Sequence, residues 1–211
     1  MGVRERKQRE KERRRQQILV AAKRVFVKKG YSRATMESIA KEAELSAGTI
    51  YLYFRNKNEL WATLTLRVLH YLLIRLDHLH SQTDLDHKGK TSQLMAVLLE
   101  AYELDPMIFK KLFDLQTSET PKELNTDLIH EINSLRRQTI KKIAAIFQQG
   151  INPGICPDRH PMEIADIVWS MFSGVILWTT GKHTKDYAAD QLKPTLETAF
   201  EILEKGILVH K

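Results

Sequence analysis

The chain has 211 residues, 43% of them hydrophobic, with a formal net charge of +7 and only nine glycines and six prolines. This length and composition indicate a soluble, helix-rich protein with one large or two small domains, and they argue against a disordered chain. The single cysteine excludes an intramolecular disulfide, and together with the lack of a signal sequence it indicates a cytoplasmic protein.

The positive charge is concentrated at the N-terminal end. Residues 1–60 hold 16 Lys and Arg against 7 Asp and Glu, hence +9, whereas the remaining residues hold 17 against 19, hence −2. The run Arg4–Arg15 alone has eight basic and three acidic residues. A polyanion would therefore be attracted to this end of the protein, although such a run is also typical of a solvated tail.

The first predicted helix spans Arg4–Lys29, which contains no Gly or Pro. Its second half has apolar residues at helical spacing, at Ile18, Ala21, Ala22, Val25 and Phe26. We expect this half to pack on a core and the charged half to project or fray. Gly30, after two lysines, is a typical helix stop.

Two short helices follow, separated by a turn. Thr35 is a good N-cap for a helix that runs to Ala43, and Ser46 can cap a second helix that ends near Phe54. This spacing is that of a helix-turn-helix. In the second helix Ile50 and Phe54 share one face. The other face has no charge, so an ordinary core helix is the alternative interpretation.

The rest of the chain also has helical periodicity, and no segment alternates like a strand. The sequence thus predicts an all-α fold of about nine helices. A polar loop is expected at Ser81–Lys90 and a Gly- and Pro-rich loop at Gly150–Pro161. The further helices are predicted at about 57–80, 94–104, 107–115, 122–149, 162–181 and 188–208.

The run GYSRATMESIAKEAELSAGTIYLYFRNKNEL, residues 30–60, resembles the DNA-binding domain of the TetR family of bacterial transcriptional regulators. The resemblance implies that one set of residues forms the surface for the DNA major groove: Ser46, Ala47, Gly48, Thr49, Tyr51, Leu52 and Tyr53. It also implies that Arg33, Thr35, Tyr53 and Lys57 lie close to phosphates, which suits helix N-termini and cationic side chains.

The sequence departs from the family pattern in two places. Glu44 stands in the turn where most members have glycine, and a non-glycine residue in a left-handed conformation costs about 1 kcal/mol. The recognition helix also has no Arg, Asn or Gln, the side chains that make the strongest bidentate contacts with bases. The operator sequence therefore cannot be predicted.

The resemblance implies a division into a DNA-binding domain at residues 1–60 and a helical effector-binding and dimerisation domain at residues 61–211. The helix at 162–181 is apolar most of the way round, and a helix buried on several sides needs more than its own core. With the helix at 188–208 it could form a four-helix bundle across a two-fold axis. Burial within one subunit is the alternative.

The resemblance further implies a small-molecule pocket among the central helices. The candidate lining residues are largely aromatic: Tyr102, Met107, Phe109, Phe113, Trp169, Phe172 and Trp178. They suggest a hydrophobic effector, such as a fatty-acyl compound, a drug-like cation or an aromatic. Met107, Phe109 and Phe113 are equally well explained as core. Repression is the commoner outcome in the family, but activation, or action without an effector, remains open.

Other classes of function have weaker signals. The histidines and acids between Asp77 and His87 match no standard metal-ligand spacing, so we expect no metal site, and we expect no cofactor. Cys156 has no basic neighbour in sequence nearer than Arg159, which indicates an inert thiol. Gly181–Thr184 lacks the strand and glycine of a phosphate loop, so no catalytic residue is assigned and no enzyme is predicted.

A membrane interaction would explain the basic N-terminal helix but not the helix-turn-helix. The longest uncharged run, residues 167–181, is shorter than the roughly 20 residues that a spanning helix needs. We therefore predict no membrane partner. The expected partners are double-stranded DNA, a second copy of the chain and a small hydrophobic molecule.

Overall fold

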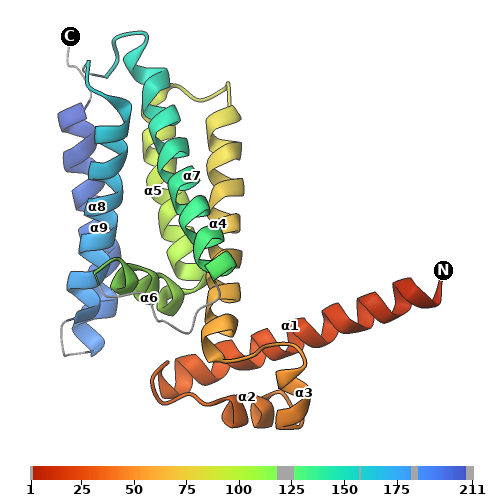
Figure 1. The fold of residues 1–211 in the computed structure, drawn as a ribbon. Helices are drawn as coiled ribbons and strands as arrows, with labels where there is room; N and C mark the ends of the chain where they lie inside the picture. Colours follow the sequence, from red (N-terminus) through yellow and green to blue (C-terminus); the bar gives the residue numbers. More distant parts are fainter. Residues whose placement is uncertain (1, 118–125, 157, 182–184, 208–211) are drawn as a thin grey trace. The chain divides into compact units, whose positions relative to one another are not determined.

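A computed structural model describes residues 2–117, 126–156, 158–181 and 185–207, and the only regular secondary structure in these ranges is helical. The predicted all-α architecture of about nine helices is confirmed, with nine helices in the described ranges (Figure 1). The helices are α1 (Val3–Lys29), α2 (Met36–Glu42), α3 (Ala47–Tyr51), α4 (Lys57–Ser81), α5 (His87–Leu104), α6 (Pro106–Thr117), α7 (Thr126–Ile151), α8 (Pro161–Gly181) and α9 (Lys185–Ile207).

The described chain divides into two compact units. The N-terminal unit comprises residues 2–65 and 126–129, and the C-terminal unit comprises residues 66–117 and the described residues from 130 onward. Helix α4 begins in the first unit and continues in the second.

The N-terminal unit has a core built from the apolar faces of its short helices. The second half of α1 is buried against α2, and α2 packs on α3. The core side chains include Ile18, Leu19, Ala22, Phe26, Ile39, Ile50, Phe54, Leu60 and Trp61. The predicted anchors of the recognition helix, Ile50 and Phe54, are confirmed as buried.

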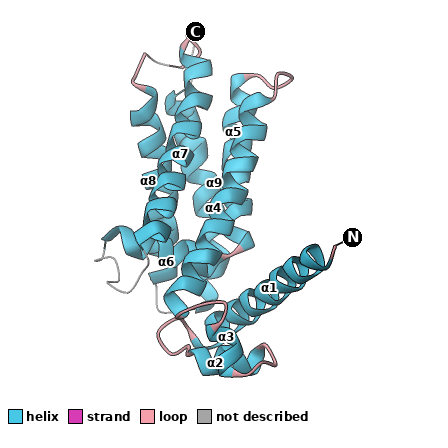
Figure 2. Ribbon diagram, turned by 45° about the vertical axis from the view of Figure 1, so that its right-hand side comes forward, coloured by secondary structure: helices cyan, strands magenta, loops and turns pink. Residues whose placement is uncertain are grey.

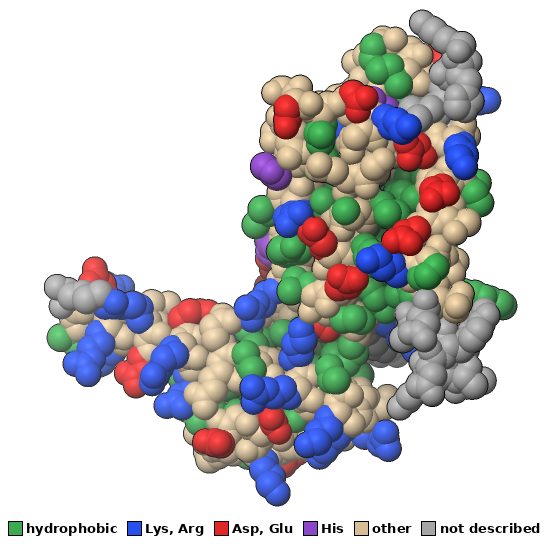
Figure 3. Space-filling view, turned by 180° about the vertical axis from the view of Figure 1, so that it is seen from behind, with side chains coloured by type: hydrophobic (Ala, Val, Ile, Leu, Met, Phe, Trp, Pro, Cys, Tyr) green, Lys and Arg blue, Asp and Glu red, His purple; other side chains and the backbone are tan. Residues whose placement is uncertain are grey.

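The charged half of α1 is helical but contributes no side chain to the core. Residues 2–13 are all exposed, and the first buried side chain is that of Ile18. This segment therefore projects as a helix (Figure 2). Lys and Arg side chains are frequent along it in the space-filling view of Figure 3.

Two predicted boundaries were wrong. Helix α3 ends at Tyr51, not Phe54, because the carbonyl of Ile50 accepts from both Tyr53 N at 2.9 Å and Phe54 N at 3.0 Å and tightens the last turn. The loop expected at Ser81–Lys90 is shorter, because α5 begins at His87. Asp86 caps α5 by accepting from Gly89 N at 2.7 Å.

The C-terminal unit is a bundle. In Figures 1 and 2 α5, α7, α8 and α9 run lengthwise beside one another, and the short α6 lies across them near one end. Helix α8 packs against α6 and α9, and α5 packs against α6 and α9. These contacts bury an aromatic cluster in which neighbouring ring centroids are 5.7 to 6.2 Å apart: Tyr102, Phe109, Phe113, Trp169 and Phe172.

Helix α8 is unusually apolar. Within the described residues, Pro161–Thr179 is the one segment long and apolar enough to cross a membrane by length and composition. A core helix passes the same test, and this one packs on two neighbours. Only 39% of the segment is buried, however, so α8 retains an exposed apolar side.

Candidate nucleic-acid interface

Side-chain caps fix both helices of the helix-turn-helix. Thr35 Oγ1 accepts from Ser38 N at 3.1 Å, and Ser38 Oγ accepts from Thr35 N at 3.1 Å, which is a reciprocal capping arrangement. Ser46 Oγ accepts from Thr49 N at 3.1 Å and lies 2.8 Å from Thr49 Oγ1. The predicted N-caps are thus confirmed, and both helices begin where their free N–H groups can meet an anion.

The turn between these helices is left-handed at Glu44. Its φ is 54°, the only positive φ of a non-glycine residue within the described ranges. A glutamate therefore adopts the left-handed conformation at this position, at a cost of about 1 kcal/mol. The turn is held by Leu45 N, which donates to Ala40 O at 3.0 Å, and by Gln17 Nε2, which donates to Ala43 O at 2.7 Å.

The uncharged face of α3 is open to solvent. Leu52 is 81% exposed and Tyr51 48%, while Ser46 and Gly48 are exposed and Tyr53 is partly buried. A Cβ added at Gly48 would meet no atom nearer than Ser46 Oγ, at 3.9 Å. Since no packing within the unit explains the glycine or the exposed leucine, this face is available for contact with another molecule.

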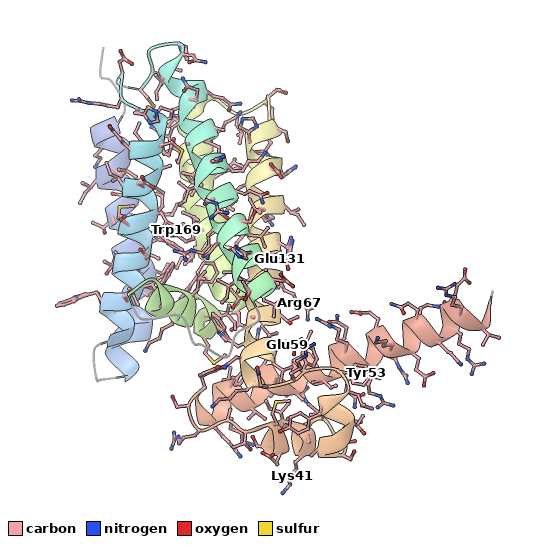
Figure 4. The ribbon with its side chains drawn as sticks, in the orientation of Figure 1. Lys41, Tyr53, Glu59, Arg67, Glu131 and Trp169 are labelled. Carbon is pink, nitrogen blue, oxygen red and sulfur yellow. The ribbon has the colours of Figure 1, made fainter. Side chains whose placement is uncertain are left out.

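Exposed cationic side chains are present in the segments next to α3. Arg15 places its guanidinium carbon 4.8 Å from the centre of the Phe54 ring, so α1 passes beside the end of α3. Arg33 and Arg55 are exposed, and Arg33 Nε donates to Lys29 O at 3.0 Å. Positive charge that α3 itself lacks is therefore present beside its end at Arg15 and in the segments that hold Arg33 and Arg55. Figure 4 labels Tyr53, which follows α3.

Lys57 has contacts that the sequence did not predict. Its Nζ donates to the carbonyls of Tyr31 at 3.1 Å and of Ser32 and Ala34 at 3.2 Å, and it lies 4.9 Å from the centre of the Tyr31 ring. Because an ammonium group has three N–H donors, these bonds use its full capacity. In the free protein, Lys57 ties the loop before α2 to the start of α4.

We expect replacement of Lys57 by methionine to destabilise the free protein by about 1–3 kcal/mol, because three carbonyls would lose a charged donor. Thermal unfolding without DNA measures this effect. Arg55→Met is the matched control, since Arg55 is exposed in the same loop and its substitution should leave the unfolding temperature unchanged. If Lys57→Met weakens only DNA binding, a phosphate contact is its main role.

A protein-family comparison matches residues 18–64 to the family described as bacterial regulatory proteins, tetR family. The match begins in the buried half of α1 and ends in α4, so it covers the whole helix-turn-helix. A curated relative, the fatty acid metabolism regulator protein of Bacillus subtilis, is 24% identical over 193 residues, which are 90% of this chain and 94% of the relative. The chain belongs to the TetR family.

Other TetR relatives extend the match beyond the N-terminal unit. The transcriptional regulator TtgR of Pseudomonas putida is 33% identical over 136 residues, which are 64% of this chain and 56% of TtgR. The crystal structure of FadR from Bacillus subtilis in complex with stearoyl-CoA has a TM-score of 0.66 at 22% identity and covers 91% of this chain and 98% of FadR. The whole chain therefore has a TetR-like fold and is a transcriptional regulator, and these relatives are regulators, not enzymes.

The predicted effector-pocket residues of this TetR chain do not all lie together. Five of them form the buried aromatic cluster, and Met107 is partly buried on α6. Trp178 is 71% exposed. Trp169 alone of the set lines a groove between α7 and α8, which Figure 4 helps to locate by its label.

The other wall of this groove was missed by sequence reasoning. It is formed by α7 residues spaced three and four apart, among them Arg136, Arg137 and Lys141. The spacing is visible in the sequence, but cations at helical intervals are usual on any solvated face. Only the position of α8 across the groove distinguishes this stripe from an ordinary solvated face.

One contact among the candidate metal and redox residues was not predicted from the sequence. Within the described ranges no group of three or more His, Cys, Asp or Glu could hold a metal. His87 is buried, and its Nε2 lies 2.9 Å from Cys156 Sγ. Burial lowers the pKa of His87 and raises the pKa of Cys156, so both groups favour their neutral forms.

Residues 182–184 of the phosphate-loop alternative lie outside the described residues.

Proposed function

We propose that this TetR-family regulator is a cytoplasmic homodimer that represses transcription by binding a near-palindromic operator and is released by a hydrophobic small molecule. We assign DNA binding to residues 1–60 and effector binding and dimerisation to residues 61–211. The observation that carries the DNA-binding part is the exposed, uncharged face of α3 on a buried anchor, with the guanidinium of Arg15 beside that anchor.

The helix-turn-helix offers two kinds of contact to DNA, with base edges and with phosphates. Gly48 allows the backbone of α3 to approach base edges, and Thr49, Tyr51 and Tyr53 offer hydroxyl and apolar contacts to bases or phosphates. Ala47 and Leu52 add apolar surface suited to thymine methyl groups. Arg33 and the N-termini of α2 and α3, at Thr35 and Ser46, suit phosphates.

The dimer proposal is supported by an exposed apolar stripe on α8 and α9. Ile167 and Trp178 on α8 are 55% and 71% exposed, and Ile202 on α9 is 68% exposed. Helices α8 and α9 pack on each other, so a second copy of the chain could cover these exposed apolar side chains together. A two-fold axis would place the same stripe of two copies in contact. Two α3 helices could then read half-sites about 34 Å apart, one helical turn of DNA.

The effector proposal is supported by the relatives. One is a fatty acid metabolism regulator, and FadR has been solved in complex with stearoyl-CoA. An effector would release DNA by binding one of two dimer shapes better than the other. Activation, or regulation without an effector, is the alternative for this part of the proposal.

The basic N-terminal unit should make DNA binding strongly dependent on salt. Each phosphate neutralised by Lys or Arg contributes about −0.9 to the slope of log affinity against log salt concentration, so we expect a slope steeper than about −4 per dimer. The measurement is a titration of duplex DNA, selected from a random pool for binding, at several salt concentrations. Affinity that does not change between low and physiological salt would contradict the role of this unit.

The same samples distinguish DNA from a membrane surface as the polyanion. Anionic liposomes should compete poorly with the selected duplex for the protein. The selected duplexes themselves should share a near-palindrome. A pool without any shared sequence would contradict operator recognition, and strong competition by liposomes would favour the membrane alternative.

A further inference from the structure

The groove between α7 and α8 is large enough for a small molecule. Its volume is about 490 Å³, within the range of about 300–1,000 Å³ that is typical of small-molecule sites. Both walls come from the C-terminal unit. The chemistry of these walls can therefore be compared with that of possible ligands.

The α7 wall is strongly basic. Arg136, Arg137 and Lys141 line it, with Asn133 one turn before them. Arg137 and Lys141 are four residues apart, so their like charges repel each other on the helix surface. Among the described residues, Asp166 from α8 is the only carboxylate that lines this groove, so its described lining has three cations, one anion and a net charge of +2.

These three cations have no partners among the described residues. None of them takes part in a described ion pair or hydrogen bond. The neighbouring Lys142, which does not line the groove, is paired with Asp77. The positive charges of the groove are thus not neutralised, whereas the charge of Lys142, one residue beyond Lys141, is neutralised by Asp77.

Arg136 has the least favourable position of the three. It is partly buried, and burial lowers the pKa of its guanidinium, with no acidic residue acting to raise it. Removing a charge from water without a counter-charge costs free energy. A planar guanidinium also matches carboxylate and phosphate geometry by two parallel hydrogen bonds. An anion bound in the groove would therefore supply the counter-charge that Arg136 lacks.

The remaining wall is apolar. Met162 and Trp169 of α8 and Ile140 of α7 line it. The Trp169 ring is fixed from behind by Phe113, at a centroid distance of 5.7 Å, so this wall is firm. A ligand that filled the groove would need an apolar body as well as a negative head.

We propose that the α7–α8 groove binds an amphipathic anion, a carboxylate or phosphate head on an aliphatic or aromatic body, with the head on Arg136. A cationic amphiphile is excluded by the same charges. The identification of this anion with the effector rests on the proposed function, whereas its binding in the groove does not.

Calorimetric titration of the full chain without DNA tests the proposal. The probes are dodecanoate and lauroyl-CoA, which distinguish a free acid from a phosphate-bearing thioester, with dodecylammonium and dodecanol as cationic and neutral controls, all below their micellar concentrations. We expect one or both anions to bind at least about tenfold more tightly than either control. Equal affinity for dodecanoate, lauroyl-CoA and dodecylammonium would overturn the proposal.

Variants locate the site. Arg136→Met should weaken anion binding about tenfold or more while raising the unfolding temperature of the free protein, because it removes an uncompensated charge. Arg137→Gln provides a second, exposed position in the same wall, and Arg67→Met on α4, outside the groove, should change nothing. Anion affinity that is unchanged in both Arg136→Met and Arg137→Gln would overturn the proposal.

DNA binding by the same samples separates the two proposals. Anion binding without any DNA binding would support the groove and contradict the proposed regulator mechanism. Specific DNA binding by a protein that binds neither anion would overturn the groove proposal and leave the DNA-binding part of the proposed function intact.

Discussion

Replacement of Gly48 by leucine should lower operator affinity by at least about 100-fold, equivalent to about 3 kcal/mol, without unfolding the protein. The added side chain meets only Ser46 Oγ within 4 Å of its Cβ, so the free protein has room for it. In the complex, the same side chain would occupy the space through which the backbone of α3 approaches the bases.

The smaller change Gly48→Ala makes the test sharper. Alanine is a better helix former than glycine by about 1 kcal/mol, so the free protein should become more stable while its affinity for DNA falls. Thermal unfolding and DNA titration of one preparation measure both. Ala96→Leu, on the exposed side of α5, adds similar bulk outside the N-terminal unit and should leave both unchanged. If Gly48→Leu bound the operator with the same affinity as the parent protein, α3 would not be part of the DNA interface.

Replacement of Ile167 by arginine should convert a dimer into monomers. The 24.5 kDa chain should sediment at twice that mass before the change and at 24.5 kDa after it, because a charge would be buried in the proposed α8–α9 interface. Operator affinity should fall by about 10²–10⁴-fold, since the second half-site would no longer be held nearby by the first.

Ile74→Arg is the matched control for this prediction. Ile74 lies on α4 and is 67% exposed, comparable with Ile167 at 55%. Its replacement should change neither the mass nor the affinity. A monomeric parent protein, or a dimer that persists in Ile167→Arg, would show that the stripe on α8 and α9 serves another purpose.

The helix-turn-helix was predictable because its signals are local. Thr35 and Ser46 cap helices with their own side chains, and Ile50 and Phe54 are four residues apart on one face. The left-handed turn at Glu44 could be expected from the family pattern alone. Such features depend on neighbours within a few residues, which the sequence displays directly.

The features that sequence reasoning missed depend on residues far apart in the chain. The bonds of Lys57 to a loop more than twenty residues away, and the contact of His87 with Cys156, cannot be inferred from spacing. The basic wall of the groove is an ordinary charged stripe in the sequence, and only the folded chain shows that α8 forms the opposite wall. In the same way, aromatic residues grouped by type proved to be mostly a packed core, with Trp178 outside it.

A footprint of the purified protein on the DNA upstream of its own gene, at low salt, tests the central claim most directly. We expect two protected segments on one face of the duplex, related by a near-palindrome with centres about 34 Å apart, and no protection by Gly48→Leu at the same concentration. A single protected segment with no symmetry, or equal protection by the parent and by Gly48→Leu, would contradict the account of a dimer that reads its operator through α3.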